Sequence, residues 1–535
     1  MTLRERCAQL ADQLRGRPPD PSARTADGVL LPPPGVHASN LGLFLGWSKD
    51  ARWDATGRPR RAEWWLDGVF GGARQVGNVS TVEATAGVIA GPGGGKSAGW
   101  LAGVVGLIPW PGPVVVCSTK IDLAQWTAPA RARLGPVGVL DWRGSQAAAL
   151  PWPRVRWSPL DGCADEDLCL DRIESMVETT ELGGPRGEEV WRANAVSVVA
   201  AYVHAAALEG SGVERVVGWL RRDELEEPQR IIAAAGSRAG FGQTLQAFAG
   251  KAEETRQSIM HTARPALAAL DSSTVVDACT PDPSDRFDID RFLNSCGTLY
   301  ICDKGGKATV SKNAPLTVAV LNAILERAEQ RAEATPAGPG RLAGRADPPL
   351  LLVLDEMAQI SPLPNLTQVL SQARGRGITV AWGVQSWSQL ERWGEAGARA
   401  IWDTTAYRLI GAGLQDMDFL TAVSKSLGER QVWRPSVGST KHGGSGSGGS
   451  SSGKSESHTL VETPEVKAST LAKWPAGAAV LLGREGWRPV LLPALPALEP
   501  FRSRMGAGAP PAPAIAPPLD PAEGPEDEPA VEEPA

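Results

Sequence analysis

The stretch Ala90-Gly91-Pro92-Gly93-Gly94-Gly95-Lys96-Ser97 decides the fold, because it joins a short apolar run to a helical pattern. Glycines let backbone N–H groups converge on a polyphosphate, and the start of a helix adds partial positive charge. In such a loop Lys96 is expected to reach the β- and γ-phosphates, and the Ser97 hydroxyl to ligate Mg²⁺. The sequence therefore predicts a phosphate loop that binds ATP and Mg²⁺, with the loop formed by Gly91, Pro92, Gly93, Gly94 and Gly95.

One residue departs from the usual phosphate-loop pattern. Ala90 stands where the first glycine of that pattern is expected. Alanine fits there only if its backbone φ is negative, because a Cβ atom disfavours the left-handed region. A generic glycine-rich turn is the alternative interpretation, and the Gly-Lys-Ser sequence between a strand and a helix argues against it.

A second apolar run ends in two carboxylates. Leu350–Leu354 predicts a buried strand, and Asp355 and Glu356 follow it directly. Ligands bind beyond the carboxyl ends of parallel strands. Asp355 is therefore predicted to hold Mg²⁺, and Glu356 to orient and deprotonate the attacking water. Two solvated acids at an ordinary strand end are the alternative.

Two further positions complete the candidate site. The apolar run from Ile378 ends at Gln385, whose amide is predicted to contact the γ-phosphate or position water. Arg374 and Arg376 precede that run, and a guanidinium can stabilise charge on a transferred phosphoryl group, often from a neighbouring subunit. A structural hydrogen bond for Gln385, and a surface or DNA-phosphate contact for each arginine, remain open.

Composition divides the chain into segments. We expect an N-terminal lead region at 1–80, a nucleotide-binding domain at 81–161, 296–437 and 459–500, and an inserted all-helical domain at 162–295. A flexible Ser/Gly-rich loop is expected at 438–458, and a disordered tail rich in proline and acids at 501–535. The predicted fold class is thus α/β with an all-α insertion.

Net charge excludes little in this chain. The formal charge is −6, but the residues from Ala509 onward hold seven acids, nine prolines and no Lys or Arg. Without that tail the charges nearly cancel, so charge neither indicates nor excludes a nucleic-acid partner. There is no apolar run of membrane-spanning length, and the seven cysteines lack regular spacing, which favours a reducing cytoplasm.

In series these motifs resemble the type IV coupling proteins of conjugative DNA transfer, in their TraG/TraD-like form. The resemblance covers about residues 80 to 495. It rests on the phosphate loop, Val114–Leu123, Trp157–Cys163 and Thr298–Ile301. It rests further on Leu354–Ile360, Gly375–Ile378 and Gln385-Ser-Trp-Ser-Gln-Leu390. It implies a RecA-like ATPase that assembles as a hexameric ring, with Lys96, Ser97, Asp355, Glu356, Gln385 and Arg374 in the roles given above.

The resemblance also implies partners. Such proteins deliver DNA or a nucleoprotein to a secretion channel, so DNA, relaxosome proteins and channel proteins are the expected partners. Family members usually begin with membrane helices, which this sequence lacks. We therefore expect a cytoplasmic protein, or one held at the inner face of the membrane by a separate anchor protein. An ATPase that moves or remodels proteins, and a nucleotide-binding scaffold without DNA pumping, are the alternatives.

Overall fold

The computed structural model describes residues 43–48, 65–66, 75–79, 84–107, 110–182, 189–237, 240–304, 310–338, 343–440, 453–483 and 486–497. The predicted tail at 501–535 and most of the predicted lead region at 1–80 lie outside these residues. Among the described residues, no helix is long and apolar enough to cross a membrane.

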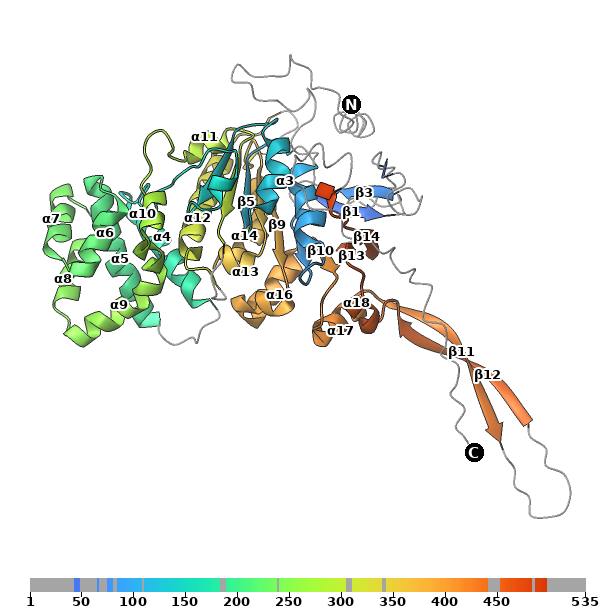
Figure 1. Cartoon of the computed structure of the whole chain (residues 1–535). Helices are drawn as coiled ribbons and strands as arrows, with labels where there is room; N and C mark the ends of the chain where they lie inside the picture. The colour runs from blue at the N-terminus through green and yellow to red at the C-terminus, as the bar shows by residue number, and fades with distance from the viewer. Residues whose placement is uncertain are drawn as a thin grey trace.

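A 12-stranded sheet forms the centre of the described chain, and its middle strands are parallel (Figure 1). Apolar runs fully buried in the sheet form these strands, as expected when helices cover both faces. In spatial order the parallel strands are β10 (Tyr407–Gly411), β4 (Ala86–Ile89), β9 (Ile378–Val384), β8 (Leu350–Leu354), β5 (Val114–Ser118), β7 (Thr298–Cys302) and β6 (Val137–Asp141).

The direction of each crossover assigns the helices to the two faces. Crossovers between parallel strands are right-handed, so connections running toward β6 lie on one face and those running toward β10 on the other. The first face carries η3 (Lys96–Leu101), α2 (Ala102–Gly106) and α3 (Asp122–Arg131). The second carries α12 (Ala314–Ala334), α13 (Met357–Ile360), α14 (Leu366–Ala373), α15 (Trp387–Leu390) and α16 (Gly394–Thr404). The α/β fold class is confirmed.

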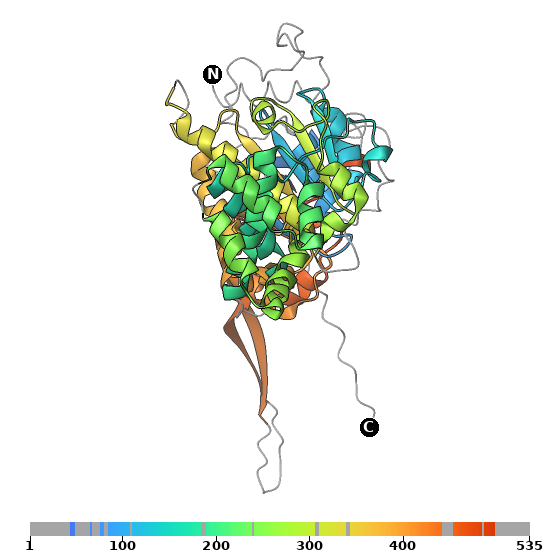
Figure 2. The same ribbon diagram turned by 90° about the vertical axis from the view of Figure 1, so that its left-hand side faces the viewer.

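A helical block interrupts the α/β domain between β6 and β7, within the range predicted for it. It lies beside one end of the sheet and faces the viewer in Figure 2. Its helices are α4 (Glu166–Glu181), α5 (Glu189–Glu209), α6 (Val213–Arg222), α7 (Glu226–Ala235), α8 (Phe241–Ala249), α9 (Glu253–Leu267), α10 (Ser273–Ala278) and α11 (Ile289–Leu293).

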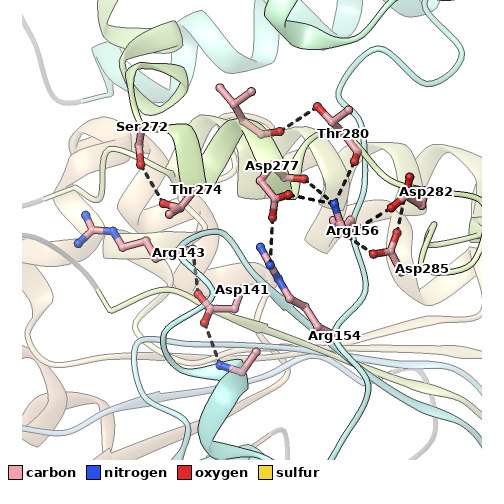
Figure 3. A network of polar contacts seen from close by, with 12 residues as sticks. Asp141, Arg143, Arg154, Arg156, Ser272, Thr274, Asp277, Thr280, Asp282 and Asp285 are labelled. Atoms are coloured by element: carbon pink, nitrogen blue, oxygen red, sulfur yellow. Dashed lines mark hydrogen bonds and ion pairs between the residues drawn. The ribbon is translucent and has the colours of Figure 1, made fainter.

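Arg156 fastens the block where the chain leaves and re-enters the α/β domain (Figure 3). Its Nε donates to Asp285 Oδ2 at 2.5 Å and its Nη1 to Asp277 Oδ1 at 3.0 Å. The backbone N–H of Arg156 donates to the carbonyl of Asp285, and Phe287 donates back to the carbonyl of Arg156. One side chain therefore ties the outgoing strand segment to both the end of α10 and the returning loop.

A two-stranded antiparallel ribbon projects from the body at the end opposite the helical block (Figure 1). It is formed by β11 (Glu429–Thr440) and β12 (Gly453–Pro464), paired in continuous register. The loop predicted at 438–458 is therefore wrong for 438–440 and 453–458, and 441–452 lie outside the described residues. Backbone pairing carries the ribbon through Ser- and Gly-rich sequence that lacks the apolar alternation of a predicted strand.

Strands from both ends of the sequence complete the sheet beyond β10. The chain after the ribbon forms the antiparallel pair β13 (Ala478–Gly483) and β14 (Gly486–Leu491). Two helices, α17 (Met417–Ser426) and α18 (Ala468–Ala472), precede and follow the ribbon. β13 pairs antiparallel with β10, and β14 pairs with β1 (Phe44–Ser48). β3 (Gln75–Val79) and β2 (Trp65–Leu66) then extend the sheet from β1. Part of the lead region thus belongs to the same sheet.

Candidate active site

Close packing explains the glycines of the phosphate loop, which follows β4. Gly93 and Gly95 have φ values of 76° and 88°, in the region that side chains disfavour. A Cβ at Gly91 would lie 2.3 Å from the carbonyl oxygen of Gly413, and one at Gly94 would lie 2.6 Å from that of Ala412. The loop therefore packs directly against the backbone that follows β10. Gly91 and Gly94 are required there because any side chain would collide with that backbone.

Ala90 keeps this geometry although it replaces a glycine. Its φ is not among the positive values, so its Cβ is not strained. The methyl group lies against Gly411, where an added Cβ would come within 2.6 Å of it. A glycine on β10 thus makes room for the alanine, and the departure from the usual pattern leaves the loop intact.

Lys96 lies against the two carboxylates that follow β8. Its Nζ is 2.5 Å from Glu356 Oε1 and 3.5 Å from Asp355 Oδ1, and all three side chains are buried. Ser97 Oγ donates to Asp355 Oδ2 at 3.0 Å. The structure therefore brings together the phosphate-loop pair and the acidic pair, which are about 260 residues apart in the sequence.

The backbone and the electrostatics mark the acidic pair as a specialised site. Glu356 has φ 54° and ψ 44°, a left-handed conformation that non-glycine residues rarely adopt outside functional sites. Burial raises the pKa of Asp355 above its ordinary value, although Lys96, Ser97 and Ser118 favour the charged form. Asp355 Oδ1 and Glu356 Oε2 are buried and accept no hydrogen bond from the described residues.

Gln385 follows β9, the strand between the phosphate-loop strand and the acidic strand. Its Nε2 donates to Glu356 Oε1 at 2.6 Å. Glu356 Oε1 thus accepts from both Lys96 and Gln385, whereas Oε2 accepts from none of the described residues. The three strand ends place an amide, a carboxylate and an ammonium in direct contact.

These residues line a cavity of about 510 Å³, within the range of small-molecule sites. The residues that line it include Gly91–Gly99, Gly477 and Leu492–Ala494. The donor set fits a magnesium nucleotide: hydroxyl and carboxylate oxygens are the ligands Mg²⁺ prefers, and glycine N–H groups with Lys96 suit phosphates. Asp355 Oδ1 is buried and accepts no hydrogen bond from the described residues, which supports this fit.

Arg374 does not reach this cavity within its own chain. It belongs to η6 (Arg374–Arg376), just before β9, whereas Gln385 follows the far end of that strand. Its side chain is exposed and makes no hydrogen bond or ion pair with any described residue. Arg376 pairs instead with Glu329 of α12. Arg374 could therefore contact a bound nucleotide only in the cavity of a neighbouring molecule.

Sequence reasoning missed the contact made by Ser118. Ser118 Oγ, at the end of β5, donates to Asp355 Oδ2 at 3.1 Å, beside the bond from Ser97. A signal was present, because Val114–Ser118 is an apolar run that ends in a polar residue, like the runs before Asp355 and Gln385. Carboxyl ends of neighbouring parallel strands meet at one edge of the sheet.

Comparisons with known proteins agree with this geometry. Residues 349–474, which contain the acidic pair, Gln385 and the ribbon, match the family described as the TraM recognition site of TraD and TraG. Over these residues the chain is similar to the TraG and TraD coupling proteins. The resemblance found in the sequence is thereby confirmed. No curated protein matches the sequence significantly.

Solved structures of a bacterial conjugative coupling protein, TrwB, have the same fold. Unbound TrwBdeltaN70 is 19% identical, with 77% of this chain and 85% of that chain covered and a TM-score of 0.54. TrwB in complex with ADP and Mg²⁺ is 18% identical, covering 84% and 95%, also at 0.54. TrwB with the GTP analogue GDPNP gives 18%, the same coverage and 0.55. At these identities the likeness concerns the fold.

Proposed function

We propose that the chain is an ATPase that moves DNA toward a conjugative secretion apparatus. The observation that carries the chemistry is the contact among Lys96, Glu356 and Gln385 at the carboxyl edge of a parallel sheet. The family match and the fold of a conjugative coupling protein support the transport role.

Each group of residues in the site would have a separate role in ATP hydrolysis. The loop N–H groups and Lys96 would hold the β- and γ-phosphates, and Ser97 and Asp355 would hold Mg²⁺, with Ser118 orienting the carboxylate. Bound Mg²⁺ supplies charge stabilisation to the phosphates. Glu356 presents its unpartnered oxygen Oε2 for the proton of the attacking water. Gln385 would orient that water against the γ-phosphate.

A ring assembly completes the proposal. Arg374 is exposed at the edge opposite the phosphate loop, so a neighbouring subunit would have to supply it to the site, as in a hexamer. The expected partners are DNA, relaxosome proteins and channel proteins. The protein would act in the cytoplasm, at the inner face of the membrane where a separate anchor protein recruits it.

One comparison tests the chemistry and the DNA partner together. ATP hydrolysis is measured for wild type, Lys96→Ala and Lys473→Ala, with and without DNA, over a range of salt. Lys473 is an exposed lysine outside the cavity and serves as the matched control. We expect DNA to stimulate wild type and Lys473→Ala, less so at high salt, because phosphate contacts release counterions. Lys96→Ala should be inactive.

The other outcomes favour the alternatives. Hydrolysis that DNA does not change, but that a protein substrate stimulates, favours an ATPase that acts on proteins. Nucleotide binding without hydrolysis favours a scaffold. A wild-type rate in Lys96→Ala contradicts the proposed mechanism itself.

A further inference from the structure

Gln389 holds the turn that carries Gln385. β9 ends at Val384, and the next backbone N–H, that of Gln385, donates to Gln389 Oε1 at 2.7 Å. A backbone N–H can only donate, so this contact fixes which end of the Gln389 amide faces the turn. The side chain of Gln385 extends from the same residue to Glu356. The side-chain oxygen of Gln389 thus helps to fix the backbone of Gln385, and through it the contact of the Gln385 side-chain amide with Glu356.

Trp387 holds the same turn from a second side. Its ring is stacked on Phe419 of α17, with centroids 5.2 Å apart and planes at 18°, and it meets Trp402 of α16 edge-on at 5.8 Å. Phe419 and Trp402 also meet edge-on, at 5.7 Å. Such aromatic contacts have preferred geometries, so Trp402 and Phe419 help to fix the position of Trp387 within the turn.

Gln389 itself does not belong to the nucleotide cavity. It is not among the residues that line the cavity, whereas Gln385 is. Its effect on ATP turnover would therefore have to pass through Gln385. Loss of the acceptor would leave the phosphate loop, the acidic pair and Lys96 in place and displace only the amide beside Glu356.

We propose that Gln389 is a positioning residue for ATP hydrolysis, which holds Gln385 against Glu356 through the backbone of the turn. The inference rests on the proposed ATPase function. It gives a role to the second glutamine of the Gln-Ser-x-x-Gln-Leu sequence, to which the mechanism above assigned none.

Two isosteric substitutions separate the acceptor from the volume of the side chain. Gln389→Met keeps the length and removes the acceptor, whereas Gln389→Glu keeps an oxygen at the same place. Misplacement of an orienting group by about 1 Å can cost 10²-fold in rate. We expect kcat of Gln389→Met to fall roughly 10–100-fold, with KM and nucleotide Kd unchanged within about twofold. Gln389→Glu should keep most of the wild-type kcat.

A double-mutant cycle tests whether the effect passes through Gln385. If it does, Gln385→Ala/Gln389→Met is no slower than Gln385→Ala alone, because the residue to be positioned is already gone. Multiplied losses in the double variant, a wild-type rate in Gln389→Met, or a Gln389→Glu variant as slow as Gln389→Met would each overturn the inference.

Hydrogen exchange gives a readout that needs no activity. The amide of Gln385 should be protected in wild type and Gln389→Glu and should exchange faster in Gln389→Met, as seen in a peptide spanning residues 380–390, which keeps Gln385 away from its N-terminal end. Equal protection in all three overturns the inference. If wild type fails to hydrolyse ATP, the proposed function fails, and this exchange comparison still decides whether Gln389 holds the turn.

Discussion

Glu356→Gln should bind ATP more tightly than wild type while losing hydrolysis. The Lys96 ammonium is 2.5 Å from Glu356, so phosphates that bind Lys96 must compete with this carboxylate. Glutamine keeps the shape of the side chain and weakens this competition. It also removes a negative charge that repels the γ-phosphate.

The size of the gain follows from the hydrogen bond that is replaced. A hydrogen bond to a charged partner contributes about 1.5–3 kcal/mol, and a neutral one about 1 kcal/mol. The difference, about 0.5–2 kcal/mol, corresponds to a Kd lower by roughly 2- to 30-fold. Loss of the proton acceptor should lower the hydrolysis rate by about 10²–10⁴-fold.

Equilibrium titration with a fluorescent, non-hydrolysable ATP analogue at fixed Mg²⁺ measures the first effect, and single-turnover hydrolysis measures the second. Glu395→Gln is the matched control, because Glu395 is an exposed acid paired only with Arg399 on its own helix. An unchanged or higher Kd in Glu356→Gln would show that the contact between Lys96 and Glu356 does not oppose nucleotide binding.

Three further substitutions test the structure around the site. Gly99→Ala should destabilise the fold by about 1–3 kcal/mol and weaken nucleotide binding, because its Cβ would lie 2.2 Å from the carbonyl oxygen of Leu492. Gly242→Ala on α8 is the control in thermal melts, because its Cβ would meet only the Ile232 side chain, at an ordinary contact distance of 3.8 Å. Asp355→Asn should raise Tm at pH 7, because burial raises the pKa of Asp355 in the folded state. The protonated carboxyl stabilises the fold below the ordinary pKa of aspartate, and this stability is lost as the pH rises through the folded-state pKa. The Tm advantage of asparagine should therefore disappear in acid, below the ordinary pKa of aspartate. Arg156→Met should speed proteolysis between residues 277 and 287 without changing ATP hydrolysis, and equal cleavage of the two proteins would exclude Arg156 as the fastening of the helical block.

Local sequence was sufficient to predict which side chains gather at the sheet edge, but not the contacts that they make there. Lys96, Asp355 and Gln385 were predicted because each follows an apolar strand, and strand ends meet at one edge of a parallel sheet. The direct contact between Lys96 and Glu356 was not predicted. It depends on the left-handed backbone of Glu356, which residue type does not reveal.

Strands whose pairing partners stabilise them could not be predicted from the local sequence pattern. β1 has no helical or alternating pattern strong enough to be recognised, and it forms because β3 and β14 offer free backbone groups. The outer part of the ribbon was predicted as loop for the same reason, since its register is set by pairing nearer the root. Pairing of this kind depends on context more than on intrinsic propensity.

The ribbon of β11 and β12 is a long arm that projects from the body of the protein (Figure 1). At its root the N–H of Glu465 donates to the carbonyl of Gly428, and Ser424 Oγ on α17 donates to the carbonyl of Val466. Twelve paired residues at about 3.4 Å each give an arm of about 40 Å. A 10° rotation at the root would displace the tip by about 7 Å over that length. Because α17 also carries Phe419 against Trp387 in the turn after Gln385, a rotation of α17 would move both this turn and the root of the ribbon.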